Sequence, residues 1–292
     1  MQRLLSISIL LLVMIVMTAA QTSNSAKSYF QRAKLRLAQG DLDGAISDFD
    51  AALVFNPRLA DAYVNRGAAR YQKGDFAAAI TDFDKAIEIK PRLAIAYNDR
   101  GNARLAGKNV DGALADYTKA IEIKPQFTEA LYNRANIRQE VGDLTGAIAD
   151  YTDALKANPN LLSAYNNRGN ARYIAGDVDG AIADYTRGIQ LSPRPGTVRE
   201  PSGNTLLALN YNGRGNALAA QGKLDLAIAD YSAAIEIAPR FADAYANRGL
   251  ALLRRGRTSE AERDFEQSLR LDPSLKTSLE GRINKVTAAP KR

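Results

Sequence analysis

Apolar residues recur along most of the chain three or four positions apart, with polar residues between them. Ala79, Phe83 and Ala86 mark one such stripe. This spacing is typical of a helix that buries one side. A similar stretch, rich in alanine, ends just before Gly74 and Asp75, and these two residue types favour the end of one helix and the N-cap of the next. The pattern therefore predicts two helices joined by a short turn.

This two-helix pattern recurs every 34 residues. The period is marked by prolines, at positions 57, 91, 125, 159, 193, 239 and 273, and by the aromatic residues Phe49, Phe83, Tyr117, Tyr151, Tyr185, Tyr231 and Phe265. Only the interval from 193 to 239 is longer, by twelve residues. The sequence thus predicts five copies over 24–193 and two over 206–273. The insertion 194–205 holds two prolines and two glycines and is predicted to be a loop.

The ends of the array have patterns of their own. Leu275, Leu279, Ile283 and Val286 keep helical spacing after the last proline, which predicts a helix over 274–287 that caps the stack. Residues 288–292 are expected to be a basic tail, and residues 21–25 a linker.

The first twenty residues predict export. Arg3 precedes an apolar run over 4–17, and small residues follow it up to Ala20. This arrangement is typical of a secretory signal peptide, here with cleavage after Ala20. An uncleaved N-terminal anchor is the alternative. We expect a protein of the periplasm or cell envelope, with secretion as a further possibility.

Composition argues against catalysis. The 292 residues include no His and no Cys, which excludes a Ser-His-Asp triad, a cysteine nucleophile and the usual zinc sites. We expect no enzyme activity, no metal and no cofactor. The formal net charge is +7, but the basic residues are spread along the chain, which argues against a nucleic-acid partner.

The repeat unit resembles a known family. The 34-residue period with Tyr63, Gly67, Ala79, Phe83 and Pro91 is similar to the tetratricopeptide repeat (TPR), in the bacterial variant with Tyr-x-Asn-Arg-Gly. The resemblance implies an all-α, right-handed superhelical solenoid of seven helix-turn-helix repeats, in which the first helix of each repeat lines a concave face. It also implies a protein that binds other proteins.

Each copy carries an arginine and, sixteen residues later, an aspartate. The candidate structural pairs are Arg66 with Asp82, Arg134 with Asp150, and Arg168 with Asp184, together with their equivalents in the other four copies. A fixed separation predicts a hydrogen-bonded pair within each repeat rather than a row of cations for a ligand. As exposed pairs, these would each contribute only about 0–1 kcal/mol.

Asparagines gather on the first helices, although asparagine is a modest helix former. A carboxamide both donates and accepts, so a row of them suits the backbone of an extended peptide. The candidate peptide-binding residues are Asn65, Asn98, Asn102, Asn133, Asn136, Asn166, Asn167, Asn170, Asn216, Asn247 and Tyr132. Alternatively, these asparagines only keep the groove polar or bond along the array.

These observations predict a non-enzymatic scaffold that binds an extended segment of a partner protein in its concave groove. The alternative is a basic protein that contacts an anionic cell-wall polymer or a membrane surface through its net charge and the mildly basic segment 276–292. The sequence does not predict an oligomeric state or the identity of the partner.

Overall fold

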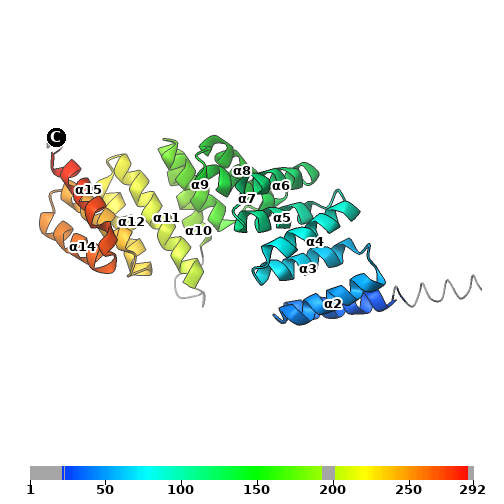
Figure 1. Cartoon of the computed structure of the whole chain (residues 1–292). Coiled ribbons are helices and arrows are strands. Elements are labelled where there is room, and N and C mark those ends of the chain that lie inside the picture. The colour runs from blue at the N-terminus through cyan, green and yellow to red at the C-terminus, as the bar shows by residue number, and fades with distance from the viewer. Residues whose placement is uncertain (1–21, 23, 193–200, 289–292) are drawn as a thin grey trace, which may run out of the picture. The chain divides into compact units, whose positions relative to one another are not determined.

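The computed structural model describes residues 22, 24–192 and 201–288, with side chains from residue 205 onward in the last range. The described residues form helices and turns without strands. A first helix covers residues 24–38. It is followed by α2 (Leu42–Phe55), α3 (Ala60–Gln72), α4 (Phe76–Ile89), α5 (Ala94–Ala106), α6 (Val110–Ile123), α7 (Thr128–Glu140), α8 (Leu144–Ala157), α9 (Leu162–Ile174), α10 (Val178–Leu191), α11 (Pro201–Ala220), α12 (Leu224–Ile237), α13 (Ala242–Arg254), α14 (Thr258–Leu271), the short 3₁₀ helix η1 (Pro273–Leu275) and α15 (Lys276–Ala288) (Figure 1).

The chain divides into two compact units, one up to Ala130 and one from Leu131 onward. In the first unit α3 packs against α4, α4 against α5, and α5 against α6. In the second unit the same order holds from α8 to α14. Within these two stretches each helix therefore packs on its neighbours in sequence, and the predicted all-α repeat fold is confirmed.

The turn inside each hairpin follows from two residues. Gly74 has a φ of 84°, a left-handed conformation that glycine adopts at little cost. Asp75 then caps α4, because its side chain accepts a hydrogen bond from the backbone N–H of Ala78 at 3.1 Å. In the third copy Lys108 stands in this glycine position and also has a positive φ, of 63°.

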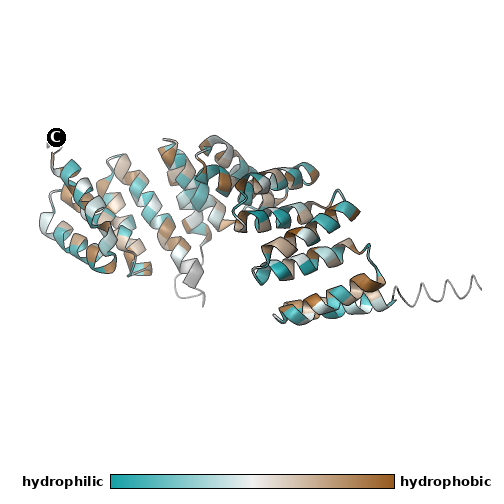
Figure 2. Cartoon of the chain, in the orientation of Figure 1, coloured by the Kyte–Doolittle hydropathy of each residue, from teal (hydrophilic) through white to brown (hydrophobic). Residues whose placement is uncertain are grey.

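The core lies between successive hairpins. Phe83 of α4 is buried in a cluster with Val64 from α3 and Ala96 from α5, so it fills the space between its own hairpin and the next. The helices approach closely here: a Cβ atom on Gly67 would lie only 2.8 Å from the Phe83 ring. Individual helices consequently carry both apolar and polar residues along their length (Figure 2).

The predicted loop over 194–205 is wrong in its last part. Helix α11 begins at Pro201, so residues 201–205 are helical. Proline is compatible with the first turn of a helix, where its missing N–H would have no partner in any case. The residues of the insertion before Pro201 lie outside the described residues.

At the ends, residues 24 and 25, predicted as part of a linker, are already helical. The C-terminal cap forms as a 3₁₀ turn followed by α15, and Leu279 of α15 is buried against Ala246 and Leu250 of α13. The predicted signal peptide, residues 1–20, and residues 289–292 of the tail lie outside the described residues. Within the described part of the chain, none of the helices is both long and apolar enough to cross a membrane.

Candidate functional site

The seven arginine–aspartate pairs expected from the spacing are all present. In each, the guanidinium donates to both carboxylate oxygens, as Arg168 does to Asp184 at 2.9 and 2.6 Å. The pairs are Arg32–Asp48, Arg66–Asp82, Arg100–Asp116, Arg134–Asp150, Arg168–Asp184, Arg214–Asp230 and Arg248–Asp264. They are not the exposed pairs that we expected, because every aspartate is buried. Removing one partner of a buried pair leaves an uncompensated charge, so these pairs matter more than exposed ones.

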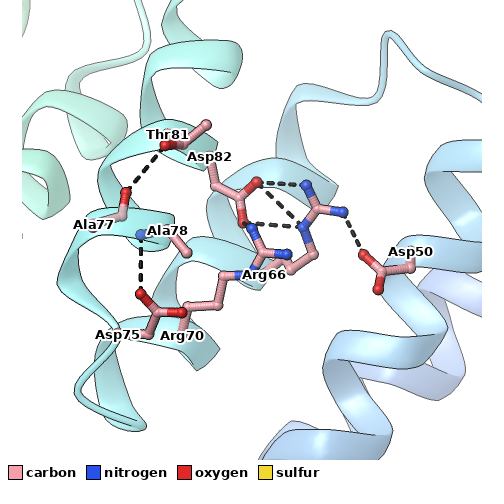
Figure 3. Close-up of polar contacts among 8 residues, drawn as sticks. All are labelled: Asp50, Arg66, Arg70, Asp75, Ala77, Ala78, Thr81 and Asp82. Atoms are coloured by element: carbon pink, nitrogen blue, oxygen red, sulfur yellow. Dashed lines mark hydrogen bonds and ion pairs between the residues drawn. The ribbon is translucent and has the colours of Figure 1, made fainter.

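A second arginine, which the fixed separation of sixteen residues does not predict, joins the pair in five copies. Arg70, one turn after Arg66, donates to the same carboxylate of Asp82 at 2.9 Å (Figure 3). The equivalent arginines are Arg36, Arg104, Arg138 and Arg172. These arginines recur every 34 residues, and this recurrence is a signal in the sequence from which the second partner could be predicted. In the last two copies leucine occupies this position, at 218 and 252.

The first arginine also ties adjacent repeats together. Arg66 donates to Asp50 of the preceding hairpin as well as to its own aspartate (Figure 3). In the second unit Arg168 and Arg248 similarly reach Thr152 and Ser232 of the preceding repeat, at 3.0 and 3.1 Å. One guanidinium therefore fixes both the two helices of a repeat and the spacing to the repeat before it.

Four of the candidate peptide-binding asparagines satisfy buried tyrosine hydroxyls. Tyr185, which is 1% exposed, donates its hydroxyl to Asn170 Oδ1 at 2.7 Å. The same bond joins Tyr117 to Asn102, Tyr151 to Asn136 and Tyr231 to Asn216. Where the ring is phenylalanine, at 49, 83 and 265, the asparagine position holds Lys34, Ala68 and Leu250. The asparagine thus accompanies the hydroxyl, which indicates a structural role.

We expect Asn216→Ala to lower the free energy of unfolding by about 1–2 kcal/mol, because the buried hydroxyl of Tyr231 then loses its acceptor. Adding Tyr231→Phe should recover most of this loss, because the double variant reproduces the pair Ala68 and Phe83 of the second copy. Urea denaturation of the wild type, both single variants and the double variant measures the coupling. Strictly additive effects would contradict a specific role for this bond.

Most of the remaining candidates also bond within the protein. Asn167 donates to Tyr132 Oη and to Asn136 Oδ1. Asn166 is buried and donates to Asn210. Asn247 donates to Asn212 at 2.9 Å, Asn65 donates to the carbonyl of Asp61, and Asn98 is buried and donates to Asp99. Asn133 is half-buried on α7. The asparagines of the second unit therefore form linked pairs rather than a continuous row of open amides.

Asp99 stands where four other copies have asparagine. Burial raises its pKa to about 6; the hydrogen bond from Asn98 opposes the rise, and the negative charge of Glu129 adds to it. A carboxyl with a higher pKa in the folded state binds its proton more tightly when folded. The protonated side chain of Asp99 therefore contributes fully to the free energy of unfolding below its unfolded pKa, near 4. This contribution is lost as the pH rises through about 6.

We therefore expect Asp99→Asn to raise the free energy of unfolding by about 1–2 kcal/mol near pH 7.5 and to have little effect near pH 4. Thermal unfolding of both proteins at the two pH values checks this. A difference in Tm that is the same at both pH values would show that ionisation of Asp99 does not cause it.

An open cavity of about 290 Å³ lies in the second unit, among the first helices of its last repeats and the cap. Tyr173 of α9, Asn216 of α11 and Leu250 of α13 line it. Arg254 at the end of α13, and Arg282 and Lys285 on α15, line it as well. Sequence reasoning found Asn216 and Asn247 of this lining but missed the three cations.

Among the described residues, no three His, Cys, Asp or Glu side chains lie close enough together to hold a metal ion. Two acidic segments with the pattern Asp-x-Asp-Gly, at 41–44 and 177–180, cap helices: Asp41 and Asp177 accept hydrogen bonds from the backbone N–H groups of Gly44 and Gly180.

Comparison with known proteins identifies the repeat. The family described as TPR repeat matches residues 33–74, 101–142 and 215–256. Two further tetratricopeptide repeat descriptions match residues 60–93 and 242–275, and residues 132–194. Together these matches cover well over half of the chain. No curated protein matches it in sequence.

Several solved structures share the fold. The C-terminal part of a TPR repeat-containing protein from Cytophaga hutchinsonii is 16% identical, with a TM-score of 0.66 over 86% of this chain and 98% of that one. A tetratricopeptide repeat protein from Parabacteroides merdae is 19% identical, with a TM-score of 0.58 over 90% of this chain and 99% of that one. The pilF protein of Pseudomonas aeruginosa is 17% identical, with a TM-score of 0.60 over 75% of this chain and 94% of that one.

Proposed function

Because this chain belongs to the tetratricopeptide repeat family, we propose that it is a non-enzymatic scaffold that binds an extended segment of a partner protein against its first helices. Repeats of this family generally mediate protein–protein interaction. The observation that carries the proposal is the open cavity among α9, α11, α13 and α15, which presents apolar, amide and cationic groups together. Such a mixture is typical of sites that hold a ligand.

The mechanism is preorganisation. The buried aspartates, each held by one or two arginines, and the Tyr–Asn bonds fix the first helices before any partner arrives. A rigid surface loses little conformational entropy on binding, so weak contacts along an extended segment can add up to useful affinity. Many of the candidate asparagines form hydrogen bonds with other residues of the protein. The surface that binds the partner therefore includes fewer of them than the sequence predicts.

We also propose that the protein acts in the cell envelope. Support comes only from the N-terminal sequence, whose basic start, apolar run and small residues resemble a secretory signal. Cell fractionation with an epitope placed at the C-terminus, together with the N-terminal sequence of the mature protein, tests this. An N-terminus at Gln21 in an exported fraction supports it, and full-length protein in the cytoplasm contradicts it.

Selection of peptides from an unbiased display library tests the binding function. We expect the selected peptides to bind the wild type with micromolar affinity and the triple variant Tyr173→Ala, Asn216→Ala and Tyr231→Phe about tenfold more weakly. The Tyr–Phe exchange is included because it keeps the truncated asparagine from leaving a buried hydroxyl without an acceptor.

The matched control is Leu226→Ala, which removes an exposed apolar side chain from the second helix α12. Affinity should not change in this variant. Equal binding by the triple variant and the wild type would refute a site on the first helices.

A further inference from the structure

The cavity of the second unit is lined by basic residues without acidic ones. Arg254, Arg282 and Lys285 line it, and its lining contains no Asp or Glu. Among the described residues, no carboxylate lies within ion-pair distance of any of the three. Three positive charges therefore converge on one concavity without a counter-charge.

On the first helices of the repeats, by contrast, the recurring arginines are paired with aspartates. Arg248, one period before Arg282, is neutralised by Asp264 at 2.8 Å. Arg282 instead donates to the neutral side chain of Asn247 at 2.5 Å. Arg254 donates to the backbone carbonyl of Ala219 at 3.1 Å. Both guanidinium groups are thus held in place by neutral acceptors, and each keeps further N–H donors for a ligand.

The cavity also has an apolar side. Leu250, Ala251 and Val286 line it, and the ring of Tyr173 is 37% exposed beside them. Its volume of about 290 Å³ lies just below the usual range for pockets that hold small organic ligands. The cavity therefore suits one apolar side chain with adjoining backbone rather than a large organic molecule.

Building on the proposed function, we propose that this cavity binds an acidic segment of a partner protein, in which carboxylates flank a bulky apolar residue. The apolar side chain contacts Leu250 and Val286 while the carboxylates pair with Arg254 and Arg282. Arginine suits this task because its planar group binds a carboxylate through two parallel hydrogen bonds. Lys285 adds a third, more adaptable charge.

A peptide fits better than a flat anionic surface. The three cations share a concave lining with Leu250 and Tyr173, which a membrane surface or a rigid polymer would not enter. The recognised chemistry is therefore a carboxylate next to an apolar group, both on one flexible chain.

The test uses short fluorescein-labelled peptides in which a central leucine is flanked by aspartate and glutamate, with matched peptides that carry asparagine and glutamine instead. Fluorescence polarisation with the whole chain measures the affinity for both kinds of peptide. We expect the acidic peptide to bind about tenfold more tightly than its amide counterpart. The triple variant Arg254→Gln, Arg282→Gln and Lys285→Gln should lose about tenfold in affinity for the acidic peptide and little for the amide peptide.

The control variant removes the same charge elsewhere. Lys223→Gln, Arg255→Gln and Lys276→Gln lie outside the cavity lining, on exposed positions of the same unit. This variant should bind the acidic peptide within about twofold of the wild type. Equal weakening by both triple variants would overturn the proposal, because the attraction would then come from net charge. Full displacement of the peptide by phosphatidylglycerol vesicles would overturn it as well, because the cations would then serve a membrane contact.

Failure of this test alone does not refute the proposed function. If the peptides selected from the unbiased library bind at the first helices but the acidic probes do not, only the chemistry of the partner is wrong. If neither set depends on residues of the first helices, both the scaffold function and this inference are wrong.

Discussion

Asp184→Ala is expected to lower the free energy of unfolding by about 3–5 kcal/mol. Asp184 is 3% exposed and receives hydrogen bonds from both Arg168 and Arg172. Without its carboxylate, two half-buried guanidinium groups keep their charges but lose their partner, and the link between α9 and α10 is broken. Urea denaturation followed by circular dichroism measures the loss, which should appear as an early transition because repeats unfold partly independently.

The matched control is Asp264→Ala in the last copy. There a single arginine, Arg248, holds the carboxylate, since Leu252 replaces the second one. We expect a clearly smaller loss than for Asp184→Ala. A loss that is equal or larger would show that the second arginine contributes nothing to the energy of the buried aspartate.

Gly188→Ala is expected to cost about 1–3 kcal/mol, because a Cβ at this position would lie 2.8 Å from the side chain of Asn210. Both positions depart from the repeat: alanine stands at the equivalent of Gly188 in five copies and at the equivalent of Asn210 in five. Asn210 is fully buried, accepts from Asn166 and donates to the carbonyl of Leu206. The smaller glycine thus makes room for the larger asparagine.

The double variant Gly188→Ala with Asn210→Ala restores the alanine pair of the other copies. We expect it to be more stable than Gly188→Ala alone, as measured by the midpoint of thermal unfolding. A double variant that is less stable than either single variant would contradict the explanation by volume, and would place the main effect on the bond between Asn166 and Asn210.

Much of the fold could be predicted because each repeat uses the same local rules. The turn glycines, the capping aspartates and the apolar stripes are all visible within 34 residues. The fixed separation of Arg168 and Asp184 predicted their contact for the same reason. The second arginine, Arg172, also follows the period, but a fixed separation predicts only one cation for each carboxylate. The prolines and glycines of the insertion predict a loop up to Thr205 because proline usually ends a helix, but Pro201 lies in a first turn, where proline is acceptable.

The candidate site was harder to predict, because whether an asparagine is open to a ligand depends on residues far away in sequence. Asn167 bonds to Asn136, 31 residues before it, and Asn166 bonds to Asn210, 44 residues after it. Helical spacing places such residues on one face but does not show which of their hydrogen bonds are already made. The cavity cations are hard to predict for a related reason: Arg254 has no equivalent in other copies, and the sequence around Arg282 predicts only a capping helix.

Site-specific photo-crosslinking tests the central claim most directly. A photo-reactive phenylalanine analogue replaces Tyr173, which lines the cavity, or Leu226, which is exposed on the second helix α12. Each protein is illuminated with a peptide selected by the wild type. Binding to the first helices predicts strong crosslinks from position 173 and none above background from position 226. Crosslinks from position 226 alone would contradict the account.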